Sequence, residues 1–407
     1  MTTLNRIELQ TGFPHPTTLT PTHTPARMNN GLTAHEHVGF ELGWDYAHYR
    51  VTPPAPYAQE PSPLRNGLLA GQAAFGARTL AATRHVRKWL QLRLHAWLRG
   101  RSVELMQVTP NYLQQIDVSH CPITRVPLSR ALLSASDASV DRVRNDAGYA
   151  AGNLAVMSTR ANHAKAACGY RDALRVIEGI EAGAAGASAA ATAASQVAGR
   201  AHAAVVVAGP TPTPAGLGAD AWARIAVLCS FVEPLPHDEA CALPLRLLPP
   251  NRLRLFNPVQ ALQAFISQQL LKPGWARRVS GFEELLAGKA LKRDFKRFFM
   301  ALLPRVLEGG RLGGIEPLPQ TRWAIEDAWR SPLVLQRWTR FALQLTPAQC
   351  EALLVRAAAH RLATGAVMPL TEASATDGWN LDTRGYVAHT APGADGRAAA
   401  AQRQFAW

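Results

Sequence analysis

Apolar residues recur with the spacing of a helix face through the C-terminal half of the chain. Steps of three and four residues place such side chains on one side of a helix. Thr346 followed by Pro347 is typical of a helix start, because a threonine cap and a first-turn proline both fit there. Strand patterns are few in this half. We therefore predict an all-helical domain over 219–370, with helices at 222–232, 258–271, 282–286, 291–306, 323–343 and 347–363.

Residues 76–101 show the same helical pattern with an unusual charge. The segment holds seven basic residues and no acidic residue. Two interpretations stay open: a helix that lies along phosphates, or a core helix with a solvated basic face. A basic amphipathic pattern at 289–299 allows the same two interpretations. We assign 66–114 to a basic helical segment and name Arg87 and Lys88 as candidate nucleic-acid contacts.

Three stretches lack a clear period. Residues 1–65 are rich in proline and threonine and predict an extended region with one ordered island at 40–49. Residues 182–218 are mostly Ala, Gly, Thr and Pro, which favours a low-complexity linker, with an alanine-rich helix as the alternative for its first half. Residues 371–407 are polar and glycine-rich, so we expect a loosely ordered tail.

The charge and the cysteines limit the class of protein. The formal net charge is +14, which favours a polyanionic partner, with nucleic acid ahead of a membrane. No stretch of 18 residues is apolar enough to span a bilayer, and the N-terminus shows no signal pattern. A cytoplasmic protein is expected. The cysteines are odd in number and scattered, which argues against disulfides and a structural zinc site; they stand at positions 121, 168, 229, 241 and 350.

Candidate chemistry is concentrated in residues 138–165, where two short strands precede a helix. A β-branched run ends at Asp141 and Arg142, and a glycine-containing loop closes at Asn153. The second strand runs into Ser158, a residue suited to cap a helix. This order brings an acid, an amide and a helix start into one short span.

The residue types in this span suit a metal and a phosphate. Asp141 can coordinate a hard cation through a carboxylate oxygen, and Asn162 offers the same ion a neutral oxygen. Asn153 can bond backbone groups and hold the loop. Lys165 follows Asn162 by three residues, so both lie on one helix face, and Lys165 can contact a phosphate.

These residues resemble the ββα-metal motif of HNH endonucleases. The closest similarity is to the subgroup that reads SxDRID, KGY, GN, S and N..K in order. The resemblance covers about 115–175, and the segment HCPITRVPL at 120–128 is similar to the CPxTGxxL hairpin that often precedes this core. The matching positions are Ser139, Asp141, Arg142, Gly148, Tyr149, Gly152, Asn153, Ser158, Asn162 and Lys165.

The resemblance implies a DNA endonuclease that uses Mg²⁺ or Mn²⁺. It implies that Asp141 and Asn162 hold the metal and that Asn153 orders the loop. Arg142 stands where well-known members have a histidine base, and arginine cannot act as a base near neutral pH. Arg142 would instead clamp a phosphate, and the base would come from elsewhere. The nearest candidates in sequence are His120 and His163.

A separate cluster of histidine and acidic residues lies at 33–50 and includes His35, Glu36, His37, Asp45 and His48. If His35 and His37 lay on a strand, both could face one metal ion. The pattern is not specific, and an aromatic island that packs against the central module is the competing interpretation.

The sequence thus predicts an α+β fold, predominantly α-helical, in which a small HNH-like module at 115–181 joins a helical domain. The first functional hypothesis is an HNH-type, metal-dependent endonuclease acting on duplex DNA. The alternative is a catalytically silent HNH-like module that only binds nucleic acid, and a third is a helical interaction protein. The candidate catalytic residues are Asp141, Arg142, Asn153 and Asn162, and the candidate phosphate contacts are Arg142, Arg160, Lys165, Arg87 and Lys88.

Overall fold

The computed structural model describes residues 33–59, 61–130, 132–198, 216–272, 274–311, 317–362 and 376–387. Over these ranges the fold is mostly helical, with fifteen helices and one two-stranded antiparallel sheet. No helix within them is long and apolar enough to cross a membrane. The rest of the predicted extended region, linker and tail lies outside the described residues.

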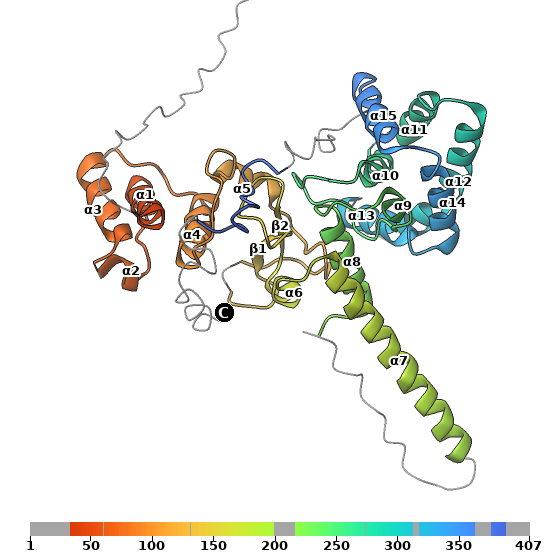
Figure 1. The fold of residues 1–407 in the computed structure, drawn as a ribbon, viewed down its shortest axis with the longest axis horizontal. Coiled ribbons are helices and arrows are strands. Elements are labelled where there is room, and N and C mark those ends of the chain that lie inside the picture. Colours follow the sequence, from red (N-terminus) through yellow and green to blue (C-terminus); the bar gives the residue numbers. More distant parts are fainter. Residues whose placement is uncertain are drawn as a thin grey trace, which may run out of the picture.

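The N-terminal part forms a helical hairpin (Figure 1). The ordered island expected at 40–49 belongs to its first helix, and the expectation of an extended region is wrong at 34–39 and 55–59. Helices α1 (Ala34–His48) and α3 (Pro63–Phe75) pack along each other, with α2 (Ala55–Gln59) between them in sequence. A capping box between Thr33 and Glu36 starts α1. The helices touch through backbone at Gly43 and Gly67, where a Cβ would clash with a carbonyl of the other helix. Glycine contacts therefore let the two helices approach closely, in addition to the buried apolar side chains of Leu42 and Leu64.

Helix α4 (Arg84–Leu98) joins the hairpin to the middle of the protein. The ring of Trp97 covers Gly39 of α1, and Arg93 of α4 is buried in an ion pair with Asp45. Helix α5 (Pro110–Ile116) follows α4 and packs beside it. The basic helix predicted at 76–101 is confirmed over 84–98, and its apolar side is part of the core.

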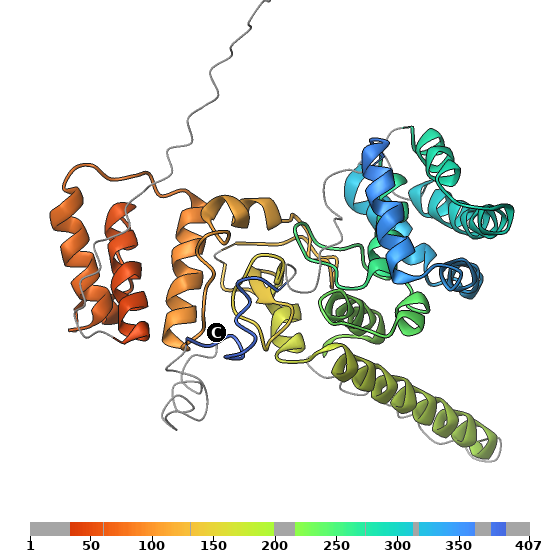
Figure 2. The same ribbon diagram turned by 45° about the horizontal axis from the view of Figure 1, so that its top comes forward.

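The central module has the order strand, loop, strand, helix. Strand β1 (Ala138–Arg142) pairs antiparallel with β2 (Leu154–Ser158) in a register that places Val140 opposite Val156. Ser158 accepts a hydrogen bond from the backbone of Ala161 and so caps α6 (Thr159–Lys165). Helix α7 (Tyr170–Ala198) then projects away from the module (Figures 1 and 2). The first part of the expected linker is therefore helical, which is the alternative that its alanine content allowed.

Eight helices make up the C-terminal part within the described residues, and they confirm most of the helical predictions. The predicted helix at 323–343 is in fact two helices, because Ser331 and Pro332 end one and start the next. Phe295, Phe298 and Trp338 form the centre of an aromatic core. The helices are α8 (Ala219–Ser230), α9 (His237–Cys241), α10 (Pro258–Gln269), α11 (Trp275–Glu284), α12 (Lys289–Arg311), α13 (Pro317–Ala328), α14 (Pro332–Ala342) and α15 (Pro347–Ala359).

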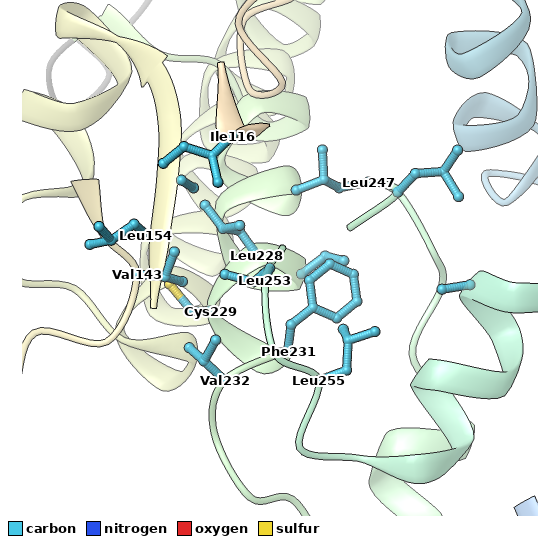
Figure 3. Close-up of a cluster of buried hydrophobic side chains, with 14 of the residues drawn as sticks. Ile116, Val143, Leu154, Leu228, Cys229, Phe231, Val232, Leu247, Leu253 and Leu255 are labelled. Atoms are coloured by element: carbon cyan, nitrogen blue, oxygen red, sulfur yellow. The ribbon is translucent and has the colours of Figure 1, made fainter. Parts of the chain in front are cut away.

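The central module and α8 share one hydrophobic core, so the packing crosses the boundary expected at 219. In Figure 3, Val143 and Leu154 of the module lie against Leu228 and Cys229 of α8. Arg224 of α8 is buried and donates to the carbonyl of Ile123 at 2.9 Å. The ββα module is therefore supported by helices that come much later in the chain.

Part of the expected tail is well packed. Residues 376–387, here called the C-terminal strap, lie beside the loop between β1 and β2 (Figures 1 and 2). Trp379 is fully buried, and its indole N–H donates to the carbonyl of Ala151 at 3.0 Å. The amide of Gly148 donates to the carbonyl of Trp379 at 2.8 Å. The expectation of a loose tail is thus wrong for the strap.

Candidate functional site

The loop between the two strands is held by Asn153, in the role that the sequence suggested. Its side chain is fully buried and accepts from the amide of Arg144 at 2.8 Å. Its amide nitrogen donates to the carbonyls of Arg144 and Gly148 at 3.0 and 3.1 Å. One side chain thereby fixes both ends of the loop that follows Asp141.

One face of β1 meets one face of α6 through two pairs of polar side chains. Ser139 and Asp141 are two residues apart on β1 and so point to the same side. Nδ2 of Asn162 donates to Oγ of Ser139 at 2.7 Å. Nζ of Lys165 lies 3.0 Å from Oδ2 of Asp141. The structure thus brings Asp141 and Asn162 to neighbouring positions on a common face, each with a partner of its own.

Lys165 does not reach toward solvent, contrary to its assignment as a phosphate contact. Its side chain is 0% exposed and also donates to the carbonyl of Arg142 at 3.1 Å. Cys229 of α8 lies beside it, and burial raises the pKa of that thiol to about 12. The helix spacing placed Lys165 on the correct face, but that face turned out to be the inner one.

The Asp141–Lys165 ion pair is buried on both sides. Burial raises the pKa of Asp141, and the nearby ammonium offsets this only in part. Burial by itself would lower the pKa of Lys165, but the carboxylate of Asp141 outweighs burial and raises it. The carboxylate of Asp141 thereby favours the charged form of Lys165, which lies next to Asp141 inside the protein.

The arrangement does not fit a divalent ion at Asp141. The ammonium of Lys165 occupies the space beside Oδ2 where a cation would bind, and Asp141 is only 5% exposed. Among the described residues no group of three or more His, Cys, Asp or Glu side chains could hold a metal ion. The amide nitrogen of Asn162 donates to Ser139, so its amide oxygen is the atom that could act as a metal ligand.

Arg142 is held by backbone carbonyls and an aromatic ring. Its Nη1 donates to the carbonyls of Asn145 and Ala147 at 3.2 and 2.8 Å. The guanidinium carbon lies 5.1 Å from the ring centre of Tyr149. Both contacts leave the rest of the guanidinium unused, so Arg142 keeps the capacity to bind an anion.

Neither candidate base faces the Asp141 side chain. His163 is exposed on α6, on a different side from Asn162 and Lys165. His120 bonds Oγ of Ser119 at 3.0 Å and packs edge-on against Trp323 of the helical domain, with 5.5 Å between ring centres. The structure therefore does not bring a histidine together with Asp141 and Asn162.

The other candidate phosphate contacts differ in availability. Arg87 is exposed on α4. Arg160 is exposed too, but donates to the carbonyl of Gly216. Lys88 is partly buried and donates to the carbonyl of Ala138 at 3.3 Å, and burial lowers its pKa. Lys88 thus connects α4 to β1, a structural role that its positive charge alone did not predict.

The hairpin before the module contains a residue that the sequence reasoning missed. Arg125 stands where the CPxTGxxL pattern has glycine, and its φ of 62° lies in the left-handed region that favours glycine. Its side chain pairs with Asp327 at 2.7 Å and with Glu326 at 3.3 Å, both in α13. Sγ of Cys121 accepts from the amides of Thr124 and Ser158 at 3.3 Å. The arginine in place of glycine was the signal in the sequence that this turn also contacts another part of the protein, here α13.

The histidine cluster near the N-terminus lies on a helix, so the strand geometry required for a shared metal is absent from it. His35 stacks on Trp97 at 5.3 Å, and the carbonyl of His35 accepts from the indole N–H at 3.0 Å. His37 pairs instead with Glu41 at 3.2 Å. These aromatic contacts are made with helix α4, whereas the competing interpretation placed them against the central module.

Comparisons with protein-family models, with curated proteins and with solved structures found no match to this chain.

Proposed function

We propose that this protein binds nucleic acid, with duplex DNA as the partner, through an HNH-like ββα module that does not hydrolyse it. The observation that carries the proposal is the buried Asp141–Lys165 ion pair. It neutralises the one carboxylate of the motif and fills the space that a catalytic cation would need. The geometry therefore supports binding better than metal-dependent hydrolysis.

The support for nucleic acid as partner is electrostatic. The net charge of +14 attracts a polyanion over a large part of the surface. Arg87 is exposed on α4, next to the module. Arg142 presents part of its guanidinium beside the loop that Asn153 holds. Such side chains contact phosphates without regard to base sequence.

A second candidate function is the Mg²⁺- or Mn²⁺-dependent HNH endonuclease. The observation that favours it is that Asp141 and Asn162 lie on a common face. The amide oxygen of Asn162 could act there as a metal ligand. In this candidate Lys165 must leave Asp141 before the two oxygens can hold a metal. A base must also be brought in, since a positioned base contributes about 10²- to 10⁴-fold to rate.

A plasmid-nicking assay combined with a binding titration separates these functions. For a silent binding module we expect no nicking with Mg²⁺ or Mn²⁺, and equal affinity in EDTA. The logarithm of the affinity should fall with the logarithm of salt concentration, with a slope of about −0.9 per phosphate contacted. Metal-dependent nicking that Asp141→Ala removes would instead establish the endonuclease.

Two further results are informative. Nicking that is equal in the wild type and in Asp141→Ala would point to a contaminant and leave the silent module in place. Absent or salt-independent DNA binding would contradict both nucleic-acid functions, and would favour the helical interaction protein.

A further inference from the structure

Three segments distant in sequence meet beside the loop of the ββα module. The backbone of residues 101–104 bonds Tyr149 on one side, with the amide of Tyr149 donating to Ser102 at 2.9 Å. On the other side, Arg101 forms a bridge with Tyr386 of the C-terminal strap. The amide of Ser102 donates to the carbonyl of Gly385 at 3.0 Å. Backbone contacts therefore fix the positions of the side chains in this region.

Two guanidinium groups are held there by aromatic rings. The guanidinium carbon of Arg101 lies 3.7 Å from the ring centre of Tyr386. That of Arg142 lies 5.1 Å from the ring centre of Tyr149. Stacking on a ring orients the plane of a guanidinium and leaves its N–H edges available.

The two arginines are close enough to affect each other. Burial, followed by the neighbouring charge of Arg142, lowers the pKa of Arg101 to about 10. Like charges that approach in a partly buried position raise the free energy of the protein unless an anion joins them. Two guanidinium groups this close to each other therefore favour the binding of an anion between them.

Neither guanidinium forms an ion pair with a carboxylate within the part of the chain that the structure describes, although the charge of Arg142 acts on the nearby Asp141. None of the ion pairs there includes Arg101 or Arg142, nor the nearby Arg99 and Arg384. Arg101 uses Nη1 to donate to the carbonyl of Arg384 at 2.9 Å, and Arg142 uses Nη1 for two carbonyls. Among the described residues, Nε and Nη2 of both arginines have no hydrogen-bond acceptor, which leaves two nitrogen atoms with three N–H donors on each group.

We propose that Arg101 and Arg142, held by Tyr386 and Tyr149, form a binding site for a backbone phosphate of nucleic acid. Two planar forks from different segments can each donate to phosphate oxygens, and such contacts are charge-assisted. The site rests on the proposed nucleic-acid function and adds to Arg142 of the ββα motif a second phosphate contact, Arg101, which lies outside the motif. The C-terminal strap becomes part of the binding surface, because it supplies Tyr386.

The experiment is a fluorescence-anisotropy titration of a labelled DNA duplex with the full chain over a series of salt concentrations. For Arg101→Ala we expect about tenfold weaker binding and a log–log salt slope that is smaller in magnitude by about 0.9, the value for one phosphate contact. Arg101→Lys keeps the charge but not the fork, so it should keep the slope and bind about threefold weaker. The matched control is Arg356→Ala, which removes an exposed arginine on α15 and should leave affinity and slope unchanged.

Each outcome separates the phosphate site from the proposed function. If the wild type binds DNA and Arg101→Ala binds it with equal affinity and slope, the phosphate site is wrong and the nucleic-acid function stands. If the wild type does not bind DNA, the proposed function is wrong, and calorimetry with inorganic phosphate then judges the site. Binding of phosphate that Arg101→Ala abolishes supports the site, and no binding by the wild type overturns it. Arg101→Lys keeps the test valid if Arg101→Ala fails to fold.

Discussion

Nζ of Lys165 lies 3.0 Å from Oδ2 of Asp141, and neither side chain is accessible to more than a trace of solvent. The two residues come from the end of β1 and the end of α6, so the ion pair closes the ββα unit on itself. A cation tethered by the chain stands where a catalytic metal would be required. This relationship governs both the stability and the proposed function of the module.

Removing only the lysine should be costly. Lys165→Met keeps most of the side-chain volume but leaves the buried carboxylate of Asp141 without a partner. We expect a loss of about 3–5 kcal/mol in the free energy of unfolding, the usual cost of breaking a buried ion pair. Urea unfolding followed by circular dichroism measures it. The double variant Asp141→Asn, Lys165→Met should recover most of the lost free energy of unfolding. If Lys165→Met alone left that free energy unchanged, the ion pair would not contribute to stability.

Metal ions should not change the stability of the wild type. A ligand that binds only the native state raises its unfolding free energy in proportion to the logarithm of its concentration over its dissociation constant. Because Lys165 occupies the position beside Asp141, the melting temperature should be equal in EDTA and in millimolar Mg²⁺. A rise with Mg²⁺ that is absent in Asp141→Ala would refute this and favour the endonuclease.

The loop between the strands should depend on one amide. Asn153→Ala removes three hydrogen bonds within a fully buried environment. We expect a loss of about 2–4 kcal/mol, since each buried group left without a partner costs about 1–3 kcal/mol. Hydrogen exchange of the amides at 144–152 should accelerate. Asn145→Ala serves as the control, because Asn145 makes a single exposed bond to Ala166 and should change little.

The C-terminal strap should contribute to the stability of the module. Trp379→Ala removes a fully buried ring and its bond to Ala151. A loss of about 3–5 kcal/mol is expected for such a truncation. Limited proteolysis should then cut within 376–387, while Trp379→Phe keeps part of the packing and should resist better. Wild-type resistance in Trp379→Ala would mean that the strap is not anchored by this residue.

His95 on α4 should make the protein less stable in mild acid. Burial, followed by the charges of Arg99 and Lys88, lowers the pKa of His95 to about 4. An unfolded chain has a histidine pKa of about 6.5, so between these values the unfolded state binds more protons and stability falls as the pH falls. Urea midpoints from pH 7 to 5 should drop more for the wild type than for His95→Gln. His163→Gln, at an exposed position, is the control, and an identical pH slope for wild type and His95→Gln would contradict the prediction.

Patterns that repeat over a few residues were sufficient for much of the fold. Most helices from 219 onward follow from apolar spacing, although α9 was not predicted and α11 lies at 275–284 where 282–286 was expected. Helix α6 begins after Ser158 because a serine cap satisfies a free amide there. The role of Asn153 was also accessible, since a glycine-flanked asparagine before a strand suits a loop. Each of these depends on interactions within one element or one turn.

The sequence missed the features that depend on distant segments. The α1–α3 hairpin depends on close backbone contacts at Gly43 and Gly67, which the spacing of apolar residues does not reveal. The strap looked unstructured because a single tryptophan, Trp379, supplies its anchor. Arg101 looked like any other basic residue until the fold placed it beside Arg142 and Tyr386.

The sequence by itself determined the polar residues of the module and their order: an acid on the first strand, an amide in the loop, and an amide and a lysine on one helix face. Only the tertiary structure decided which of these side chains are buried and which partners they meet. Helix α8 covers the face that contains Lys165, and in that low-dielectric environment a buried carboxylate needs a cation at once. Burial, which no local pattern reports, therefore paired Lys165 with Asp141, so that Lys165 is not accessible to a phosphate.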